Sequence, residues 1–290
     1  MGALEGRITV ITGAGRGLGR AHALLFAAEG AKVVVNDVGS APDGVGEGDG
    51  AAADTVVEEI RAAGGEAVAS HHDVATWEGG QALVQTAIDE FGGLDVLVNN
   101  AGILRDRALV HMSEDDWDAV TNVHLKGHFV PTRFAAAYWR EQAKAGTPRA
   151  ASVVHTSSTS GLLGNPGQTN YGTAKAGVAA FSRICSLELG RYGVRSNCIV
   201  PAARTRLTET APGLGDIVAA PGDGFDLWDP AHVSPVVAYL GTADCTLNGR
   251  TMFVQGGLIQ FMDGWQFGAS FEQDSRWTVA ELRETLARLA

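Results

Sequence analysis

Cysteine is scarce in this sequence, with three residues in 290. Cys185, Cys198 and Cys245 include no C-x-x-C pair, and their number is odd. A disulfide framework is therefore not expected, and we predict the buried, reduced thiols of a cytoplasmic protein.

Basic residues are also few. Lys and Arg total 22 against 33 Asp and Glu, which gives a formal net charge of −11. A protein that binds nucleic acid needs a basic face for the phosphates, so this composition argues against such a partner. It does not exclude a small anionic ligand, because such a ligand responds to the local field rather than to the net charge.

Long hydrophobic runs are missing as well, and we expect no secretory leader. The apolar runs are broken by Gly, Arg or Lys well short of the ~20 residues that a membrane span needs. The N-terminus enters an apolar run at once, with no basic segment and long apolar segment before it. We therefore expect no membrane partner.

Glycine, by contrast, is abundant, with 38 residues. These glycines follow no Gly-X-Y period and form no low-complexity tract, which excludes collagen and disorder. Apolar residues make up 45% of the chain, enough for a well-packed core. No repeat and no linker divides the sequence, so we predict a single domain.

Short apolar strands alternate with helical patterns along the chain. Strands are predicted at residues 7–12, 31–36, 66–70, 94–98, 151–156, 194–200 and 251–254. Helices are predicted at residues 18–28, 55–63, 77–91, 113–144, 171–192 and 230–240, and a capping box opens one more after Thr278. This order predicts an α/β fold, a Rossmann-type doubly wound parallel β-sheet of about seven strands with helices on both faces.

Two segments do not follow this alternation of strands and helices. Residues 202–229 follow a strand directly and are rich in Pro, Gly, Asp and Thr. Loops of this length in compact domains are usually functional, so we expect a mobile lid, the alternative being a plain surface loop. Residues 258–290 follow the last predicted strand. We therefore predict a nucleotide-binding domain at 1–257 and a C-terminal extension at 258–290.

The first strand runs into a glycine-rich turn, Thr12–Gly19. Glycine lets a pyrophosphate approach the N-terminus of the next helix, where free N–H groups favour anions. The spacing is G-x-x-x-G-x-G rather than G-x-G-x-x-G, but the position between a buried strand and a helix supports a dinucleotide site. The candidate contacts are Gly13, Arg16, Gly17, Leu18 and Gly19.

Asp37 ends the second predicted strand, eighteen residues after Gly19. An acid at this position accepts hydrogen bonds from the ribose hydroxyls of the adenosine and repels a 2′-phosphate, which favours NAD over NADP. Arg16 acts in the opposite direction, because a cation beside the ribose attracts a phosphate. We give Asp37 more weight, since an unpaired carboxylate against a phosphate is costly.

Three further residues suggest chemistry on an alcohol. Tyr171 and Lys175 lie one turn apart on a predicted helix, so both face the same side. A nearby ammonium, with a positively charged nicotinamide, favours the phenolate, which makes Tyr171 a base for the proton of an alcohol while hydride leaves its carbon. Ser158, after the fifth strand, can hydrogen-bond the substrate oxygen. We therefore predict Ser158, Tyr171 and Lys175 as the catalytic residues.

With these motifs the sequence resembles the classical short-chain dehydrogenase/reductase family. Thr12–Gly19 matches its T-G-x-x-x-G-x-G turn, Asn99–Gly102 its N-N-A-G motif, and Ser158, Tyr171 and Lys175 its catalytic spacing. The resemblance implies an NAD(P)-dependent dimer or tetramer, with residues 113–144 and the helix of Tyr171 as candidate subunit faces. It also implies further cofactor contacts, at Asp73, Val74, Asn99, Ala101, Gly102, Tyr171, Lys175, Pro201, Ala203 and Thr205.

Two positions depart from the family pattern. His124 stands where the family usually has an Asn, and Pro201-Ala202 replaces the usual Pro-Gly. Within the family, residues 33–39, 44–48, 56–60, 99–107 and 164–168 are similar to the (3R)-hydroxyacyl-CoA dehydrogenase domain of peroxisomal multifunctional enzymes of type 2. That group also has His at the position of His124, so the substitution looks tolerated.

We therefore expect an NAD-dependent enzyme that interconverts a secondary alcohol and a ketone, with a 3-hydroxyacyl-CoA or related lipid thioester as the leading substrate. One alternative is a dehydrogenase of free alcohols or hydroxysteroids without CoA, and another is a non-catalytic nucleotide-binding sensor. No metal is expected. His71, His72 and Asp73 lie at a strand end, where adjacent side chains point to opposite faces.

Overall fold

The structure is a computed structural model that describes residues 2–46, 48, 50–209 and 215–287. Its strands are β1 (Ile8–Thr12), β2 (Lys32–Asn36), β3 (Glu66–Ser70), β4 (Val96–Asn99), β5 (Ser152–Thr156), β6 (Arg195–Pro201), β7 (Thr251–Gln255) and β8 (Leu258–Phe261). The longer helices are α1 (Gly17–Ala28), α2 (Ala51–Ala62), α3 (Trp77–Phe91), α4 (Glu114–Thr121), α5 (Gly127–Lys144), α7 (Thr169–Leu189), α10 (Ser234–Gly241) and α11 (Val279–Leu286). Short helices are η1 (Leu109–His111), α6 (Thr159–Leu162), η3 (Gly190–Tyr192), α8 (Arg206–Glu209), α9 (Gly215–Val218) and η4 (Pro230–His232).

All eight strands form one sheet in the order β3-β2-β1-β4-β5-β6-β7-β8. The first seven run parallel, and β8 returns antiparallel along β7. The predicted doubly wound parallel sheet is therefore confirmed, and the eight strands of the described residues roughly match the expected number of about seven. The chain reverses direction across the sheet between β1 and β4, where ligands of such folds bind. The predicted domain boundary at residue 257 falls in the turn between β7 and β8.

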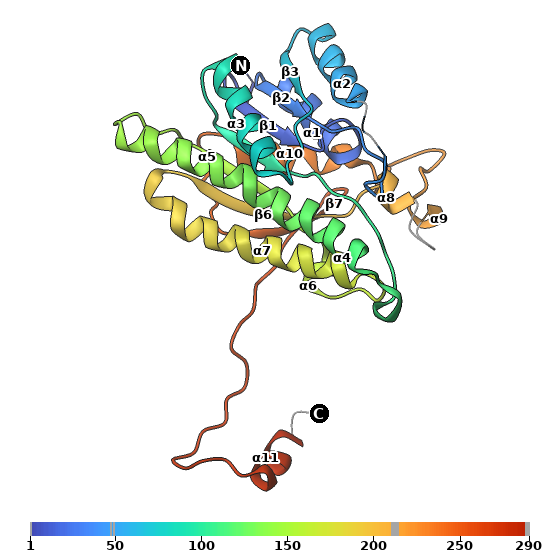
Figure 1. Ribbon diagram of the computed structural model, residues 1–290, viewed down its shortest axis with the longest axis vertical. Helices are drawn as coiled ribbons and strands as arrows, with labels where there is room; N and C mark the ends of the chain where they lie inside the picture. Colours follow the sequence, from blue (N-terminus) through green and yellow to red (C-terminus); the bar gives the residue numbers. More distant parts are fainter. Residues whose placement is uncertain (1, 47, 49, 210–214, 288–290) are drawn as a thin grey trace.

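Helices cover both faces of the sheet (Figure 1). Successive strand side chains point to opposite faces, so Val10 and Leu97 pack against α3, α5 and α7. Ile11 and Val98 pack on the other face, against α1, α2 and α10. The continuous apolar strands therefore serve two cores at once, as expected for a parallel sheet buried on both sides.

One predicted helix is broken in the structure. Residues 113–144 form α4 and α5, joined by η2 (Asn122–Lys126), a π-helical segment. A π segment accommodates an extra residue by i→i+5 hydrogen bonds and is frequent at functional sites. Periodicity alone does not reveal it, because the chain keeps its direction through the segment. His124 lies in this segment and is buried.

The C-terminal segment leaves the body of the molecule after β8 (Figure 1). The predicted capping box is confirmed, since Thr278 and Glu281 bond reciprocally at the start of α11. None of the residues of α11 is buried, and the side chains of Trp265 and Phe267 are fully exposed.

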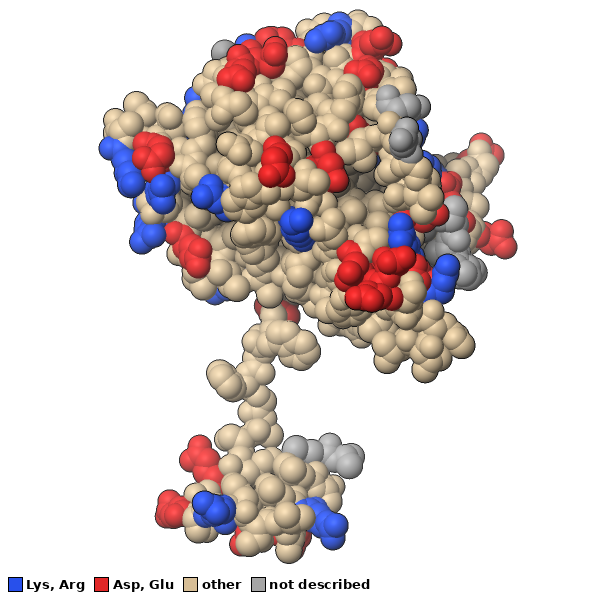
Figure 2. Space-filling view, in the orientation of Figure 1, with Lys and Arg blue, Asp and Glu red and all other residues tan. Residues whose placement is uncertain are grey.

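Among the described residues, no helix has the length and apolarity needed to cross a membrane. Acidic and basic side chains are interspersed over the face shown in Figure 2.

Candidate active site

The glycine-rich turn between β1 and α1 packs directly on the chain that follows β4. Gly13 and Gly17 have positive φ, at 62° and 52°. A Cβ on Gly13 would lie 2.7 Å from the Cα of Ala101, and a Cβ on Gly19 would overlap the carbonyl oxygen of Gly13. Two predicted cofactor regions, the turn and residues 99–102, thus meet where the sheet reverses direction. The space that these glycines leave open fits a dinucleotide cradle.

Asn100 binds the chain after β4 to the glycine turn. It belongs to the N-N-A-G motif, but it was not among the cofactor contacts predicted from the sequence. Its backbone N–H donates to Oγ1 of Thr12 at 2.9 Å, and its side-chain amide donates to the carbonyl oxygens of Thr12 and Gly13 at 3.0 and 3.1 Å. The side chain of Asn99 instead points into the core, where it donates to Oγ1 of Thr132 at 2.9 Å. The alternation of side chains along a strand places only one of two adjacent residues at the turn.

Asp37 lies against the same turn. Its carboxylate accepts hydrogen bonds from the backbone N–H groups of Gly15 at 2.9 Å and Gly39 at 2.7 Å, so its position is fixed. Arg16 is exposed at the start of α1. Burial lowers the pKa of the nearby Arg206 guanidinium, the charge of Arg16 lowers it further, and the charge of Asp37 acts to raise it.

The segment after β6 reaches the turn as well. A Cβ on Gly17 would lie 3.4 Å from Cγ2 of Thr205, so this threonine borders the cradle. Ala203 is buried beneath it. At the end of β3, the Asp73 carboxylate accepts from the backbone N–H of Ala75 at 2.8 Å, and Val74 is buried. The nearby His71 pairs with Asp54 at 3.3 Å.

The three predicted catalytic side chains converge from two elements. Ser158 caps α6 and hydrogen-bonds Tyr171, which lies in the first turn of α7. Lys175, one turn later, is only 2% exposed and donates from Nζ to the carbonyl oxygen of Thr156 at 2.6 Å. Its Nζ lies 5.6 Å from the centre of the Tyr171 ring. The predicted one-turn spacing therefore brings ammonium and phenol to one side of the helix.

Burial is the largest influence on the pKa values of Tyr171 and Lys175. Desolvation raises the pKa of Tyr171 to about 12, although the hydrogen bond from Ser158 acts to lower it. Desolvation also lowers the pKa of Lys175 to about 7. The sequence predicts that Lys175, with a positively charged nicotinamide, lowers the pKa of Tyr171. In the protein chain by itself, the loss of water has the largest effect on that pKa.

His124 packs edge-to-face on Tyr171, with ring centres 5.0 Å apart. Its Nε2 lies 2.7 Å from the carbonyl oxygen and 3.1 Å from the backbone nitrogen of Ile103, so the ring is held by the backbone of that one residue. Nδ1 is buried with no hydrogen-bond partner among the described residues. Burial and the charge of Lys175 hold the pKa of His124 well below its usual value, so the imidazole is neutral.

The pH dependence of the unfolding free energy tests whether burial lowers the pKa of Lys175. The unfolded chain binds the Lys175 proton up to its ordinary pKa of 10.5, whereas the folded chain loses it near 7. The wild type therefore gains stability as pH rises through this window. We expect Lys175→Met to be more stable than the wild type at pH 6, and this difference in unfolding free energy to shrink by about 3 kcal/mol at pH 9.5.

Chemical denaturation at both pH values, without nucleotide, checks this expectation. The matched control is Lys126→Met, which removes an exposed lysine from the neighbouring π segment. A difference between Lys175→Met and the wild type that stays constant with pH would contradict a lowered Lys175 pKa.

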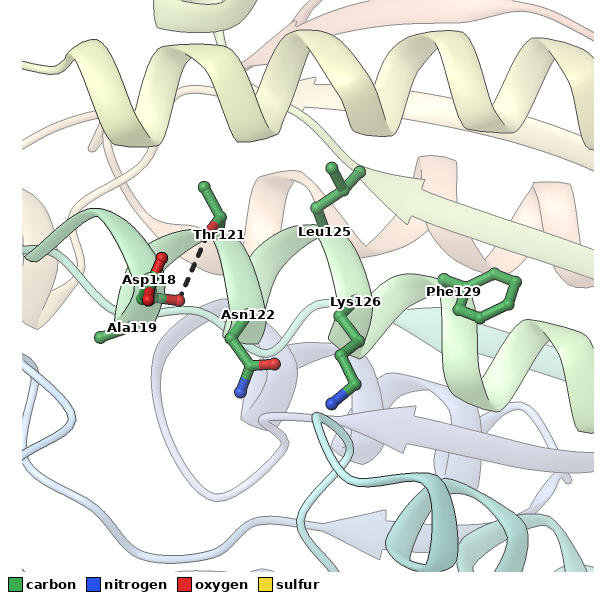
Figure 3. Close-up of a pocket in the computed structure, with 7 residues that line it drawn as sticks. All are labelled: Asp118, Ala119, Thr121, Asn122, Leu125, Lys126 and Phe129. Atoms are coloured by element: carbon green, nitrogen blue, oxygen red, sulfur yellow. Dashed lines mark hydrogen bonds between the residues drawn. The ribbon is translucent and has the colours of Figure 1, made fainter. Parts of the chain in front are cut away.

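A separate groove of about 700 Å³ lies on the outer side of α4, η2 and α5 (Figure 3). Its lining residues are Asp118, Ala119, Thr121, Asn122, Leu125, Lys126 and Phe129. Leu125 points toward α7, whereas Asn122 and Lys126 point away from it. None of the predicted catalytic residues lines this groove.

The profile of the short chain dehydrogenase family matches residues 7–212. The chain belongs to the short-chain dehydrogenase family. As a member of this family, it is an oxidoreductase that acts on CH–OH groups and uses a nicotinamide cofactor.

Several members of the short-chain dehydrogenase family are close to the chain in sequence. The hydroxyacyl-CoA dehydrogenase ChsB1 of Mycobacterium tuberculosis is 43% identical over 98% of this chain and 88% of its own. The peroxisomal multifunctional enzyme type 2 of Drosophila melanogaster is 48% identical over 84% of this chain, which spans 38% of that longer protein. The crystal structure of a short chain dehydrogenase from Mycobacterium avium superposes with a TM-score of 0.88 at 48% identity, covering 99% of this chain and 95% of that one.

Proposed function

We propose that the protein is an NAD-dependent dehydrogenase that interconverts a secondary alcohol and a ketone on a 3-hydroxyacyl-CoA or a related lipid thioester. The observation that carries this proposal is the convergence of Ser158, Tyr171 and Lys175. The ring of His124 joins this group to Gly102, next to the residue on which the glycine turn packs. The choice of substrate is supported by the similarity, over nearly the whole chain, to a relative named hydroxyacyl-CoA dehydrogenase.

The residues around the glycine turn fit a dinucleotide. The turn and Thr205 border the space for the pyrophosphate, and the fixed carboxylate of Asp37 is available to the ribose hydroxyls of the adenosine. A 2′-phosphate would meet that carboxylate, which supports NAD over NADP. When bound, NAD accepts the hydride from the alcohol carbon and adds a positive charge to the site.

The chain itself supplies the proton transfer and the orientation of the substrate. Ser158 donates a hydrogen bond to the substrate oxygen and holds it toward the phenol. Tyr171 takes the alcohol proton in oxidation and returns it in reduction. Because burial raises the pKa of Tyr171, the phenolate depends on positive charge in the site, which Lys175 provides in its ammonium form.

Other parts of the chain take roles in the same proposal. Residues 1–257 form the nucleotide-binding domain and residues 258–290 the extension, with residues 202–229 as the lid, of which 210–214 lie outside the described residues. We propose a dimer or tetramer whose subunits meet on the face of α4, α5 and α7, where the groove of Figure 3 lies. The three free, buried cysteines suit a reducing compartment such as the cytoplasm.

Formation of reduced nicotinamide by the purified protein tests the proposal. The assay contains NAD and a medium-chain (3R)-hydroxyacyl-CoA, beside its (3S) isomer and a hydroxysteroid. Turnover of the (3R) thioester alone supports the proposal. Turnover of the steroid without the thioesters would move the substrate to a free alcohol. Cofactor binding without turnover of any alcohol would favour a nucleotide sensor.

A further inference from the structure

The amide of Gln168 joins three segments that surround the catalytic residues. Gln168 precedes α7, and its carbonyl oxygen accepts from the N–H of Gly172 at 2.7 Å. Its Nε2 donates to Oδ2 of Asp106 at 2.7 Å, and its Oε1 accepts from Oγ of Ser160 at 2.7 Å and from the side chain of Asn165 at 2.8 Å. Donor and acceptor ends of one side chain are thus both engaged.

Two hydrogen-bond partners of the Gln168 side chain, Ser160 and Asp106, lie in different segments around the catalytic residues. Ser160 lies in α6, and its backbone N–H donates to Oγ of Ser158 at 3.2 Å. Asp106 lies in the segment after β4, which is bound to the α6–α7 loop by a bond from the N–H of Arg107 to the carbonyl oxygen of Gly167 at 2.9 Å. Gln168 therefore connects the segment of Asp106 and the helix of Ser158 to the helix of Tyr171.

The partly buried carboxyl group of Asp106 is expected to reduce the stability of the fold. Its Oδ1 is buried without a hydrogen-bond partner among the described residues, and burial raises the pKa of its carboxyl. A buried acceptor without a partner destabilises a fold, so a purely structural role would be filled better by a neutral residue. The groups that act on the Asp106 carboxyl are Gln168 and Arg107.

The charge of Asp106 also reaches the proposed base. The carboxylate acts to raise the pKa of Tyr171, against the hydrogen bond from Ser158. The other titratable groups that face Tyr171 are Lys175 on α7 and the neutral imidazole of His124 on the π segment. A substitution at Asp106 can therefore be followed in the pH dependence of the reaction.

We propose that Asp106 and Gln168 form a positioning pair, which sets the placement of Ser158 relative to Tyr171 and hence the alignment of the substrate oxygen. The pair acts through the catalytic residues and does not touch the substrate. This inference rests on the dehydrogenase function proposed above. It explains why residues 62 positions apart form a half-buried amide–carboxylate bond beside the phenol.

The test exchanges donor and acceptor within the pair. Gln168→Glu replaces the amide donor to Asp106 with a second carboxyl group, so the bond is lost where both groups are ionised, and we expect kcat there to fall by about 10²-fold with little change in NADH binding. Adding Asp106→Asn restores an amide–carboxylate bond in the reverse direction, and we expect at least a tenfold recovery of kcat. The matched control is Gln85→Glu, which breaks the exposed bond between Gln85 and Asp89 on α3 and leaves kcat unchanged.

A second variant, Asp106→Asn alone, covers the case in which Gln168→Glu does not fold. It keeps an acceptor for Gln168 but removes the negative charge, so the rising limb of the pH profile for oxidation should move to lower pH. Absence of recovery in a folded double variant, or an unmoved pH profile in Asp106→Asn, overturns the proposal.

A titration without substrate separates this inference from the proposed function. The phenolate of Tyr171 is followed by ultraviolet absorbance after rapid pH jumps, as the difference between each protein and its Tyr171→Phe derivative. If the wild type turns over no alcohol, the proposed function fails. A lower titration midpoint in Asp106→Asn would then still support the pairing of Asp106 with the phenol, and an unchanged midpoint would overturn it.

Discussion

Tyr171→Phe is expected to lower kcat for alcohol oxidation by about 10³-fold or more, while the binding of NADH stays nearly the same. General acid–base catalysis contributes roughly 10²- to 10⁴-fold, and phenylalanine removes the only atom of this side chain that can carry the proton. The ring itself remains, so the edge-to-face contact with His124 is kept. Steady-state turnover and NADH fluorescence titration together check the expectation.

The control for this variant is Tyr192→Phe, which removes a hydroxyl from η3, beyond the far end of α7. We expect its turnover to match that of the wild type. Turnover retained in Tyr171→Phe would refute the assignment of Tyr171 as the acid and base. A loss of both turnover and NADH binding would show instead that the substitution disturbs the fold of the site.

Asp37→Ser is expected to raise the preference for NADP over NAD, measured as the ratio of the two kcat/KM values, by about 10²-fold. Like charges in contact cost several kcal/mol, so in the proposed function the fixed carboxylate of Asp37 would repel the 2′-phosphate of NADP. With the carboxylate gone, the nearby cations of Arg16 and Arg206 remain to attract a 2′-phosphate. The binding of NAD should weaken at the same time, because its ribose loses an acceptor.

Asp43→Ser provides the comparison for this experiment. Asp43 also bonds a backbone N–H in an exposed turn, that of Val45 at 3.0 Å, but lies outside the glycine turn. Its substitution should leave the cofactor preference as it is. If Asp37→Ser still rejects NADP, the carboxylate does not decide the choice of cofactor.

Local sequence patterns predict the sheet and much of the site because they depend on short spacings. The strand–turn–helix around Gly13 and the one-turn separation of Tyr171 from Lys175 both follow from neighbouring residues. The bond between Asp106 and Gln168 does not, because nothing in the sequence near either residue points to the other. The roles of Asn99 and Asn100 also depend on where β4 ends, which sequence patterns locate less well than the strand itself.

Protonation is the other property that the sequence alone does not determine. From the spacing, Lys175 and Tyr171 look like an ammonium beside a phenol. The structure adds the loss of water around both groups, which shifts both pKa values toward the neutral forms. Burial depends on all the elements packed around a residue, so it becomes visible only once the fold is assembled.

The close contact between Gly102 and His124 limits which residues can stand together at these two positions. A Cβ at position 102 would overlap Cε1 of His124, so with this backbone the imidazole is compatible only with glycine at 102. A side chain at position 102 therefore requires the imidazole or the backbone to move, or a smaller residue at position 124. We therefore expect positions 102 and 124 to be epistatic, so that the effect of a substitution at one depends on the residue at the other.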